Sequence, residues 1–218
     1  MMTHILRLDA SARPGPNLAG AEQASFSRAL GDAVLKGLVA HGARLGAERD
    51  LGGNPLPAIA DATIKGFYAP TEAMTDALRA ATALSDTLIA EIEAADVLLI
   101  TTPIYNFGTP AALKAWIDQI MRIGRTFAYE DGAFRGLVEG KRAYVAYSYG
   151  AGGYGEGGAL NSFDFLRPYL TLILNFIGIT DVTSFAVEAT TADATTVDAA
   201  MAAALAEIER HFVSEGVA

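Results

Sequence analysis

The chain has no cysteine, only three histidines and a single tryptophan among its 218 residues. Without cysteine it can form no disulfide, thiolate metal site or cysteine nucleophile, a composition that fits the reducing cytoplasm. His4, His41 and His211 lie far apart and lack the i, i+4 spacing typical of zinc ligands. There is also no G-x-S-x-G motif. We therefore expect neither a bound metal nor serine hydrolase chemistry.

Basic residues are also scarce, with 16 Lys and Arg against 25 Asp and Glu and a net charge of −9. They form no cluster, which argues against a nucleic-acid partner or an anionic membrane surface. The amino-terminal apolar run is strand-length and follows no basic region, unlike a signal peptide. The longest apolar stretch, residues 169–179, is too short to span a bilayer. We expect a soluble cytoplasmic protein, and the 51% hydrophobic content is enough for one domain over residues 1–218.

Strand-like runs alternate with helical periodicity along the chain. The predicted strands are His4–Leu8, Ala43–Leu51, Val97–Thr102, Arg142–Ser148 and Val182–Glu188. Helices are predicted after Ser25, over about Thr71–Ala94, from near Pro110 and over about Val197–Val213, where Thr195 and Asp198 resemble a capping box. This alternation predicts an α/β fold with a doubly wound parallel sheet. The connection Leu51–Pro70 is predicted to be irregular and to serve as a lid or a dimer arm.

The segment TTPIYNFGTPAAL, residues 101–113, joins a buried strand to an amphipathic helix. Its loop therefore lies at the carboxyl edge of the sheet, where open α/β sheets bind ligands. Tyr105 and Phe107 offer flat apolar faces, and Asn106 and the backbone N–H groups offer hydrogen bonds. This combination indicates a flavin ring, and the alternative is an ordinary strand-to-helix turn.

A second candidate loop follows the first strand. Ser11 is followed by Arg13, and Ser25 and Ser27 lie at the start of the first helix. A helix N-terminus has unsatisfied N–H groups and a partial positive charge, so with these hydroxyls it can hold a monophosphate without a lysine. The alternative is that Ser25 is simply the N-cap. No G-x-G-x-x-G follows this strand and no P-loop motif occurs, which disfavours dinucleotide-binding and P-loop proteins.

A third loop, rich in glycine, follows the strand that ends at Ser148. Residues 150–158 read GAGGYGEGG, and backbone N–H groups without β-carbons can approach a ring edge closely. Such donors would stabilise the charge that develops on a flavin during reduction. The alternative is a mobile surface loop. Three candidate ligand loops that all follow strands favour a common site.

Several motifs together resemble those of the FMN-dependent NADH azoreductases and the related NAD(P)H:quinone oxidoreductases. They are S-x-R, S-F-S, T-P-I-Y-N-F-G-T-P-A-x-L-K-x-W-I-D, R-x-G-x-T-F-x-Y, G-L-V-x-G-K-x-A and I-G-I-T-D-V, and they span nearly the whole chain. The resemblance implies a flavodoxin-like fold with a five-stranded parallel sheet in the order 2-1-3-4-5 and helices on both faces. It further implies non-covalent FMN and a homodimer with an active site at each subunit interface.

Carried over by motif, the resemblance implies three groups of cofactor-binding residues. The phosphate would be held by Ser11, Ser25, Phe26 and Ser27, the ring by Ile104, Tyr105, Asn106 and Phe107, and the opposite ring edge by Ser148, Tyr149, Gly150 and Ala151. Two features depart from the family pattern. The connection from Ser11 to Ser25 is longer than usual, and Tyr149 stands where the family often has arginine.

The resemblance therefore implies a two-electron oxidoreductase with ping-pong kinetics. NADH, or alternatively NADPH, would reduce FMN and leave, and a quinone or an aromatic azo compound would then take its place. We expect no side-chain acid or base, because the hydride chemistry belongs to the cofactor. Two alternatives stay open at this point, a flavodoxin-type electron carrier without a substrate of its own and a flavin or metal-ion reductase.

Overall fold

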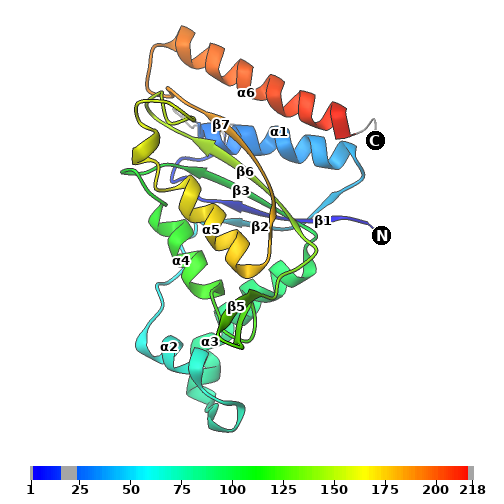
Figure 1. The fold of residues 1–218 in the computed structure, drawn as a ribbon, viewed down its shortest axis with the longest axis vertical. Helices are drawn as coiled ribbons and strands as arrows, with labels where there is room; N and C mark the ends of the chain where they lie inside the picture. The colour runs from blue at the N-terminus through cyan, green and yellow to red at the C-terminus, as the bar shows by residue number, and fades with distance from the viewer. Residues whose placement is uncertain (1, 16–23, 216–218) are drawn as a thin grey trace.

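The computed structural model describes residues 2–15 and 24–215. Its centre is a parallel sheet with the strand order β2-β1-β3-β6-β7, drawn in Figure 1. The strands are β1 (His4–Asp9), β2 (Arg44–Asp50), β3 (Val97–Pro103), β6 (Arg142–Ser148) and β7 (Asp181–Val187). Because β6 and β7 are the fourth and fifth strands of this sheet along the chain, the predicted order 2-1-3-4-5 is confirmed.

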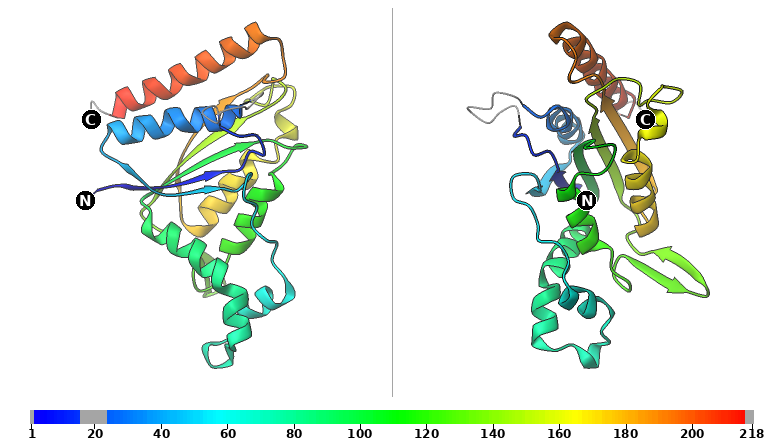
Figure 2. Two further views of the ribbon diagram at one scale, coloured as in Figure 1. Left: turned by 180° about the vertical axis from the view of Figure 1, so that it is seen from behind. Right: turned by 90° about the vertical axis from the view of Figure 1, so that its left-hand side faces the viewer.

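Helices cover both faces of the sheet. They are α1 (Phe26–Ala40), α3 (Asp76–Ala94), α4 (Ala111–Ile120), α5 (Arg167–Ile177) and α6 (Ala194–Glu215), whereas α2 (Asp61–Tyr68) lies away from the sheet. Figures 1 and 2 show α1 and α6 side by side on one face, and α3, α4 and α5 on the other. This arrangement confirms the predicted doubly wound α/β architecture.

Two apolar cores follow from this layering. The larger lies between the sheet and α3, α4 and α5, and it buries Trp116 completely. The other lies between the sheet and the helices α1 and α6, with Tyr144 and Phe212 in it. The central strand β3 is buried along its whole length because it meets both cores. The rigid sheet thereby fixes where each connecting loop begins.

Helix α5 and a short hairpin were not predicted from the sequence. Phe127–Glu130 (β4) and Ala133–Gly136 (β5) form an antiparallel hairpin. Its turn places Asp131 and Gly132 at φ of 54° and 80°, as a two-residue type I′ turn requires. Figure 2 shows the hairpin projecting from the body of the molecule on the side of the sheet that α5 covers.

Three predicted details of the helices were wrong. The region predicted to be irregular contains α2, which packs against α3 at the end of the molecule far from the sheet (Figure 1). Helix α3 begins at Asp76 after its N-cap Thr75, later than predicted. The cap of α6 is Asp193, whose carboxylate accepts a hydrogen bond from the Thr196 N–H at 3.1 Å, so the predicted capping box does not form.

Candidate flavin site

The candidate site lies at the edge of the sheet where the parallel strands end. A cavity of about 200 Å³ opens there between the loops that follow β1, β3, β6 and β7. Its lining consists of Ser11, Arg13, Ala24, Ser25, Phe26, Pro103, Ile104, Tyr105, Ser148, Gly150, Thr190 and Thr191. A larger hollow of about 630 Å³ adjoins this cavity and shares Ser25, Phe26 and Thr190 with it. Hollows of about 570 Å³ beside β1 and α3 and between α1 and α6 contain no predicted site residue.

Serine hydroxyls form what we call the phosphate end of the site. Ser25 is the N-cap of α1, and its Oγ accepts a hydrogen bond from the Arg28 N–H at 3.3 Å. Ser11 Oγ accepts one from the Arg13 N–H at 3.1 Å. A hydroxyl that accepts a bond in this way still has its own hydrogen to donate. Together with the N–H groups of the helix N-terminus, these donors fit a phosphate monoester.

Ser27 lies next to Ser25, with their Oγ atoms 3.2 Å apart, but it is buried and does not line the cavity. Phe26 does line it and belongs to the same first turn of α1. Residues 16–23, the middle of the long connection from Ser11 to Ser25, lie outside the described residues. The structure therefore brings Ser11, Ser25 and Phe26 together and keeps Ser27 one layer behind them.

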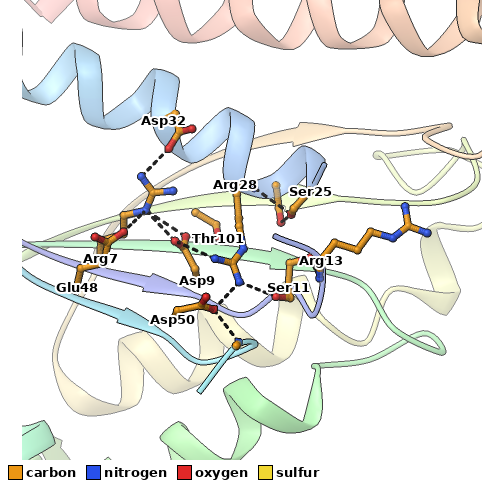
Figure 3. Close-up of polar contacts among 12 residues, drawn as sticks. Arg7, Asp9, Ser11, Arg13, Ser25, Arg28, Asp32, Glu48, Asp50 and Thr101 are labelled. Carbon is orange, nitrogen blue, oxygen red and sulfur yellow. Dashed lines mark hydrogen bonds and ion pairs between the residues drawn. The ribbon is translucent and has the colours of Figure 1, made fainter. Parts of the chain in front are cut away.

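A buried network of charged side chains lies beneath the phosphate end, as Figure 3 shows. Arg28 donates a hydrogen bond to the Ser11 carbonyl oxygen at 2.8 Å and another to Asp50 at 2.5 Å. Its Nη1 atom lies 3.6 Å from Asp9, which also accepts hydrogen bonds from Thr101 and from Arg7.

Burial alone would disfavour the charged form of Asp50. The hydrogen bonds from Arg28 and from the backbone N–H of Gly53 outweigh that burial, so the pKa of Asp50 lies below its usual value. Asp50 therefore stays ionised at neutral pH and keeps its ion pair with Arg28. The floor of the phosphate end is fixed by charge-assisted hydrogen bonds, which are shorter and stronger than neutral ones.

The loop after β3 forms what we call the ring end. The backbone groups of Tyr105 and Gly108 exchange two hydrogen bonds of 3.1 and 3.0 Å across a tight turn. Its central residues, Asn106 and Phe107, have φ of 49° and 69°, a left-handed conformation that costs free energy in residues with a β-carbon. Tyr105 accepts a hydrogen bond from the Ala12 N–H at 3.2 Å, which links the ring end to the loop after β1.

Aromatic side chains at the ring end are open to solvent. Tyr105 lines the cavity, whereas Asn106 and Phe107 are exposed and are not part of its lining. The ring of Phe107 lies 5.7 Å from that of Phe163, between centroids, and the Phe107 carbonyl accepts a hydrogen bond from the Phe165 N–H at 3.0 Å. Exposed flat rings of this kind can stack on a planar ligand.

The glycine-rich loop contributes Ser148 and Gly150 to the cavity. The side chain of Tyr149 is buried on the other side of the loop, where its hydroxyl donates to Asp164 at 2.8 Å. Burial raises the pKa of Tyr149 far above its usual value, although Arg167, 5.9 Å from the ring centroid, lowers it. Tyr149 therefore stays protonated, and only its backbone is near the site. Ala151 is exposed and lies outside the cavity.

A fourth loop, which the sequence analysis missed, follows β7. Thr190 and Thr191 line the cavity, and their hydroxyls donate to the carbonyls of Tyr149 and Gly150 at 3.0 and 2.9 Å. Glu188 in the same loop accepts hydrogen bonds from the backbone N–H groups of Gly153 and Tyr154. These contacts hold the glycine-rich loop in one place. Their position directly after a parallel strand was the signal that could have identified them.

None of the helices in the described part of the chain has the length and apolar character that spanning a bilayer requires. Within residues 2–15 and 24–215, no group of histidine and acidic side chains is arranged to hold a metal ion. The cavity lining offers hydroxyls, aromatic faces and the side chain of Arg13.

The sequence matches a protein-family model described as having a flavodoxin-like fold, over residues 3–212. It is 54% identical over 183 residues to the FMN-dependent NADH:quinone oxidoreductase of Xanthobacter autotrophicus, covering 83% of this chain and 84% of that one. The chain belongs to the flavodoxin-like FMN-dependent NADH:quinone oxidoreductase family. Another member, the FMN-dependent NAD(P)H:quinone oxidoreductase 1 of Pseudomonas aeruginosa, is 39% identical over 193 residues, 86% of this chain and 87% of that one.

Solved structures agree with this family membership at the level of the fold. An azoreductase from Bacillus anthracis superposes with a TM-score of 0.83 at 24% identity, covering 97% of this chain and 99% of that one. A second structure, an FMN-dependent NADH-azoreductase of the same species in complex with FMN, gives a TM-score of 0.80 at 20% identity and covers 97% and 99% of the two chains. The family resemblance and fold inferred from the sequence motifs are confirmed.

Proposed function

We propose that the protein is an FMN-dependent oxidoreductase that uses NADH to reduce quinones. The observation that carries this proposal is the convergence of the three predicted loops on one cavity at the carboxyl edge of the sheet. The hydroxyls of the phosphate end fit a phosphate monoester, and the aromatic ring end fits a planar ring. Relatives of similar length that bear this activity in their names support the same conclusion.

In this proposal, each end of the site has its own task. Ser11 and Ser25 hold the cofactor phosphate together with the first turn of α1, to which Phe26 and Ser27 belong. Ile104 and Tyr105 hold one side of the ring, with Asn106 and Phe107 next to them in the same loop. The backbone from Ser148 to Ala151 holds the opposite edge. Tyr149 contributes its backbone alone, because its side chain is buried against Asp164.

FMN supplies the two-electron redox chemistry when it is bound. The protein supplies position and polarity. Among the described residues, the cavity lining has no aspartate, glutamate or histidine. The backbone N–H groups of the glycine-rich loop favour negative charge on the ring edge. The exposed rings of Tyr105 and Phe107 leave one side open to flat molecules.

The nicotinamide donor and the aromatic acceptor are both flat, so in this proposal they occupy the same place beside the exposed rings in turn. We therefore propose ping-pong kinetics, with NADH leaving before a quinone or an aromatic azo compound binds. The names of the relatives include both NADH and NAD(P)H, so NADPH is tested as a second donor. We place the reaction in the cytoplasm, which fits a cysteine-free acidic chain.

We also propose a homodimer. Exposed aromatic side chains on the β4–β5 hairpin, including Tyr129 and Phe134, form a continuous cluster with Phe127 and Phe176. Large exposed aromatic surfaces are typical of protein interfaces. Sedimentation equilibrium should give twice the monomer mass of 22.8 kDa, and a monomeric mass would contradict this part of the proposal.

The function is tested by adding NADH anaerobically to the FMN-loaded protein, followed by a benzoquinone. The visible flavin absorbance should bleach with NADH and return with the quinone. FMN binding with no bleaching by NADH, together with a stabilised semiquinone on stepwise chemical reduction, would indicate the electron carrier instead. A protein that binds no FMN would contradict the proposed site altogether.

A further inference from the structure

We propose that Arg28 is a positioning residue that sets the spacing of the phosphate end and so lets the protein distinguish FMN from riboflavin. The inference rests on the proposed function. Arg28 is only 5% exposed, and it contacts both serines of the phosphate end, Ser11 and Ser25. Its guanidinium donates to the Ser11 carbonyl at 2.8 Å, and its backbone N–H donates to Ser25 Oγ at 3.3 Å.

The guanidinium acts through geometry and not through free charge. Asp50 and Asp9 neutralise it from below, at 2.5 and 3.6 Å, so it adds little positive potential to the cavity above. Its planar fork reaches three acceptors on two strands and one loop at the same time, which a lysine ammonium on a single flexible stem cannot do. Figure 3 shows the head group enclosed by Asp9, Asp50 and Ser11, whereas the side chain of Arg13 extends away from this network.

The backbone that Arg28 holds is fixed from a second side. A β-carbon added at Gly52 would lie 1.9 Å from the Ser11 carbonyl oxygen, so the chain after β2 passes directly against it. The Gly52 N–H also donates to the Asp9 carbonyl at 3.1 Å. The Ser11 carbonyl is thus held between Gly52 and Arg28, and the Ser11 hydroxyl keeps one position relative to Ser25 at the helix N-terminus.

Holding Arg28 in place carries a cost. Its Nε is buried and has no hydrogen-bond partner among the described residues. An unsatisfied buried donor on a cation is destabilising, so the network is not arranged for stability alone. Arg7 provides a matched comparison, since it is 6% exposed and pairs with Asp9 and Asp32 in the same network. Among the described residues its side chain forms hydrogen bonds with these two carboxylates and with neither serine.

The test compares Arg28→Lys with the matched control Arg7→Lys. Dissociation constants for FMN and for riboflavin, which lacks the phosphate, are measured by quenching of flavin fluorescence. Arg28→Lys should displace the serines that bind the phosphate and raise the dissociation constant for FMN about tenfold or more. The dissociation constant for riboflavin should change less than about twofold. Arg7→Lys should lower the Tm and leave the ratio of the two constants unchanged.

An unchanged ratio in Arg28→Lys, or an equal change of the ratio in Arg7→Lys, would overturn the inference. Asp50→Asn removes the charged anchor of the same guanidinium, and it takes the place of Arg28→Lys should that variant not fold. It should shift the ratio in the same direction, and an unchanged ratio there would also overturn the inference. A wild-type protein that binds neither flavin contradicts the proposed function first, and the inference with it.

Discussion

At the phosphate end, Ser11 and Ser25 are 3% exposed and rest on buried ion pairs, whereas at the ring end Tyr105 and Phe107 are 38% and 49% exposed. The first region is held by bonds to charged groups from α1, β1 and β2. The second is a strained turn held by two backbone hydrogen bonds of its own. The difference separates two requirements of a flavoenzyme, because tight cofactor retention needs fixed donors and exchange of flat substrates needs an open face.

The largest effect is expected from removing both lining hydroxyls at the phosphate end. Ser11→Ala with Ser25→Ala should weaken FMN binding by about a hundredfold or more, since each hydrogen bond to a charged group contributes about 1.5–3 kcal/mol. Riboflavin affinity should stay within about threefold, because the ring contacts remain. Titration with both flavins measures this.

The matched control for that pair is Ser85→Ala. Ser85 is a buried serine of α3 that donates to the Gln119 carbonyl at 2.6 Å, away from the cavity. It should lower the free energy of unfolding with no change in either flavin affinity. An equal loss of FMN and riboflavin in the double variant would show that the two ends of the site do not have separate tasks.

A smaller effect, about tenfold, is expected at the ring end from Asn106→Ala, since one side-chain hydrogen bond and some backbone strain are involved. FMN and riboflavin should weaken alike. Asn106→Gly separates the two causes, because glycine adopts the φ of 49° without strain. If Asn106→Gly binds like the wild type, the backbone and not the amide is responsible. Unchanged affinity, absorbance and turnover in Asn106→Ala would contradict any role for the amide.

Phe107→Leu should affect the acceptor more than the cofactor. Loss of an aromatic face costs about 0.5–1.5 kcal/mol, so the KM for a benzoquinone should rise about two- to tenfold with FMN affinity nearly unchanged. The control is Tyr68→Leu, an exposed aromatic residue of α2 far from the cavity, which should alter neither quantity. A larger loss of FMN than of quinone affinity would show that the Phe107 side chain contributes more to the cofactor than to the acceptor.

The smallest effect on the flavin is expected from Tyr149→Phe, because that side chain is turned away from the cavity. Loss of the bond to Asp164 should lower the free energy of unfolding by about 1–2 kcal/mol, with FMN affinity unchanged. The raised pKa also predicts a pH effect. In the unfolded chain the Tyr149 phenol loses its proton at about pH 10, whereas in the folded protein it keeps that proton. The free energy of unfolding of the wild type therefore falls above about pH 10, and it falls less steeply in Tyr149→Phe.

Urea unfolding at neutral pH and at high pH measures this difference. Weaker FMN binding in Tyr149→Phe would contradict the proposal that Tyr149 contributes to the site only through its backbone. An identical pH slope in the two proteins would contradict the raised pKa of the phenol.

Much of the fold could be predicted because its signals are local. The buried strand at Val97–Thr102 shows as an unbroken apolar run, and the amphipathic helices show their stripes. The β4–β5 hairpin also carried a local signal, Asp131-Gly132 between two strands, that was overlooked. Helix α2 could not be predicted, since eight residues form a helix there only by packing on α3.

The sequence predicted the loops that form the site but not the buried contacts that hold those loops in place. Loops that follow parallel strands all lie at the same edge of the sheet, so Ser11, Tyr105 and Ser148 line one cavity. Arg28 pairs with Asp50, which lies 22 positions away on a different element. No pattern in the sequence indicates such a pair. The inward turn of Tyr149 likewise depends on Asp164, a tertiary contact that the sequence does not encode locally.

The most direct test of the account is the affinity of the wild-type protein for FMN compared with riboflavin, measured under one set of conditions. Two serine hydroxyls and a helix N-terminus at a dianionic phosphate predict that FMN binds about a hundredfold more tightly or better. Equal dissociation constants for the two flavins would show that the serines over Arg28 hold no phosphate, and the division of the site into a phosphate end and a ring end would be wrong.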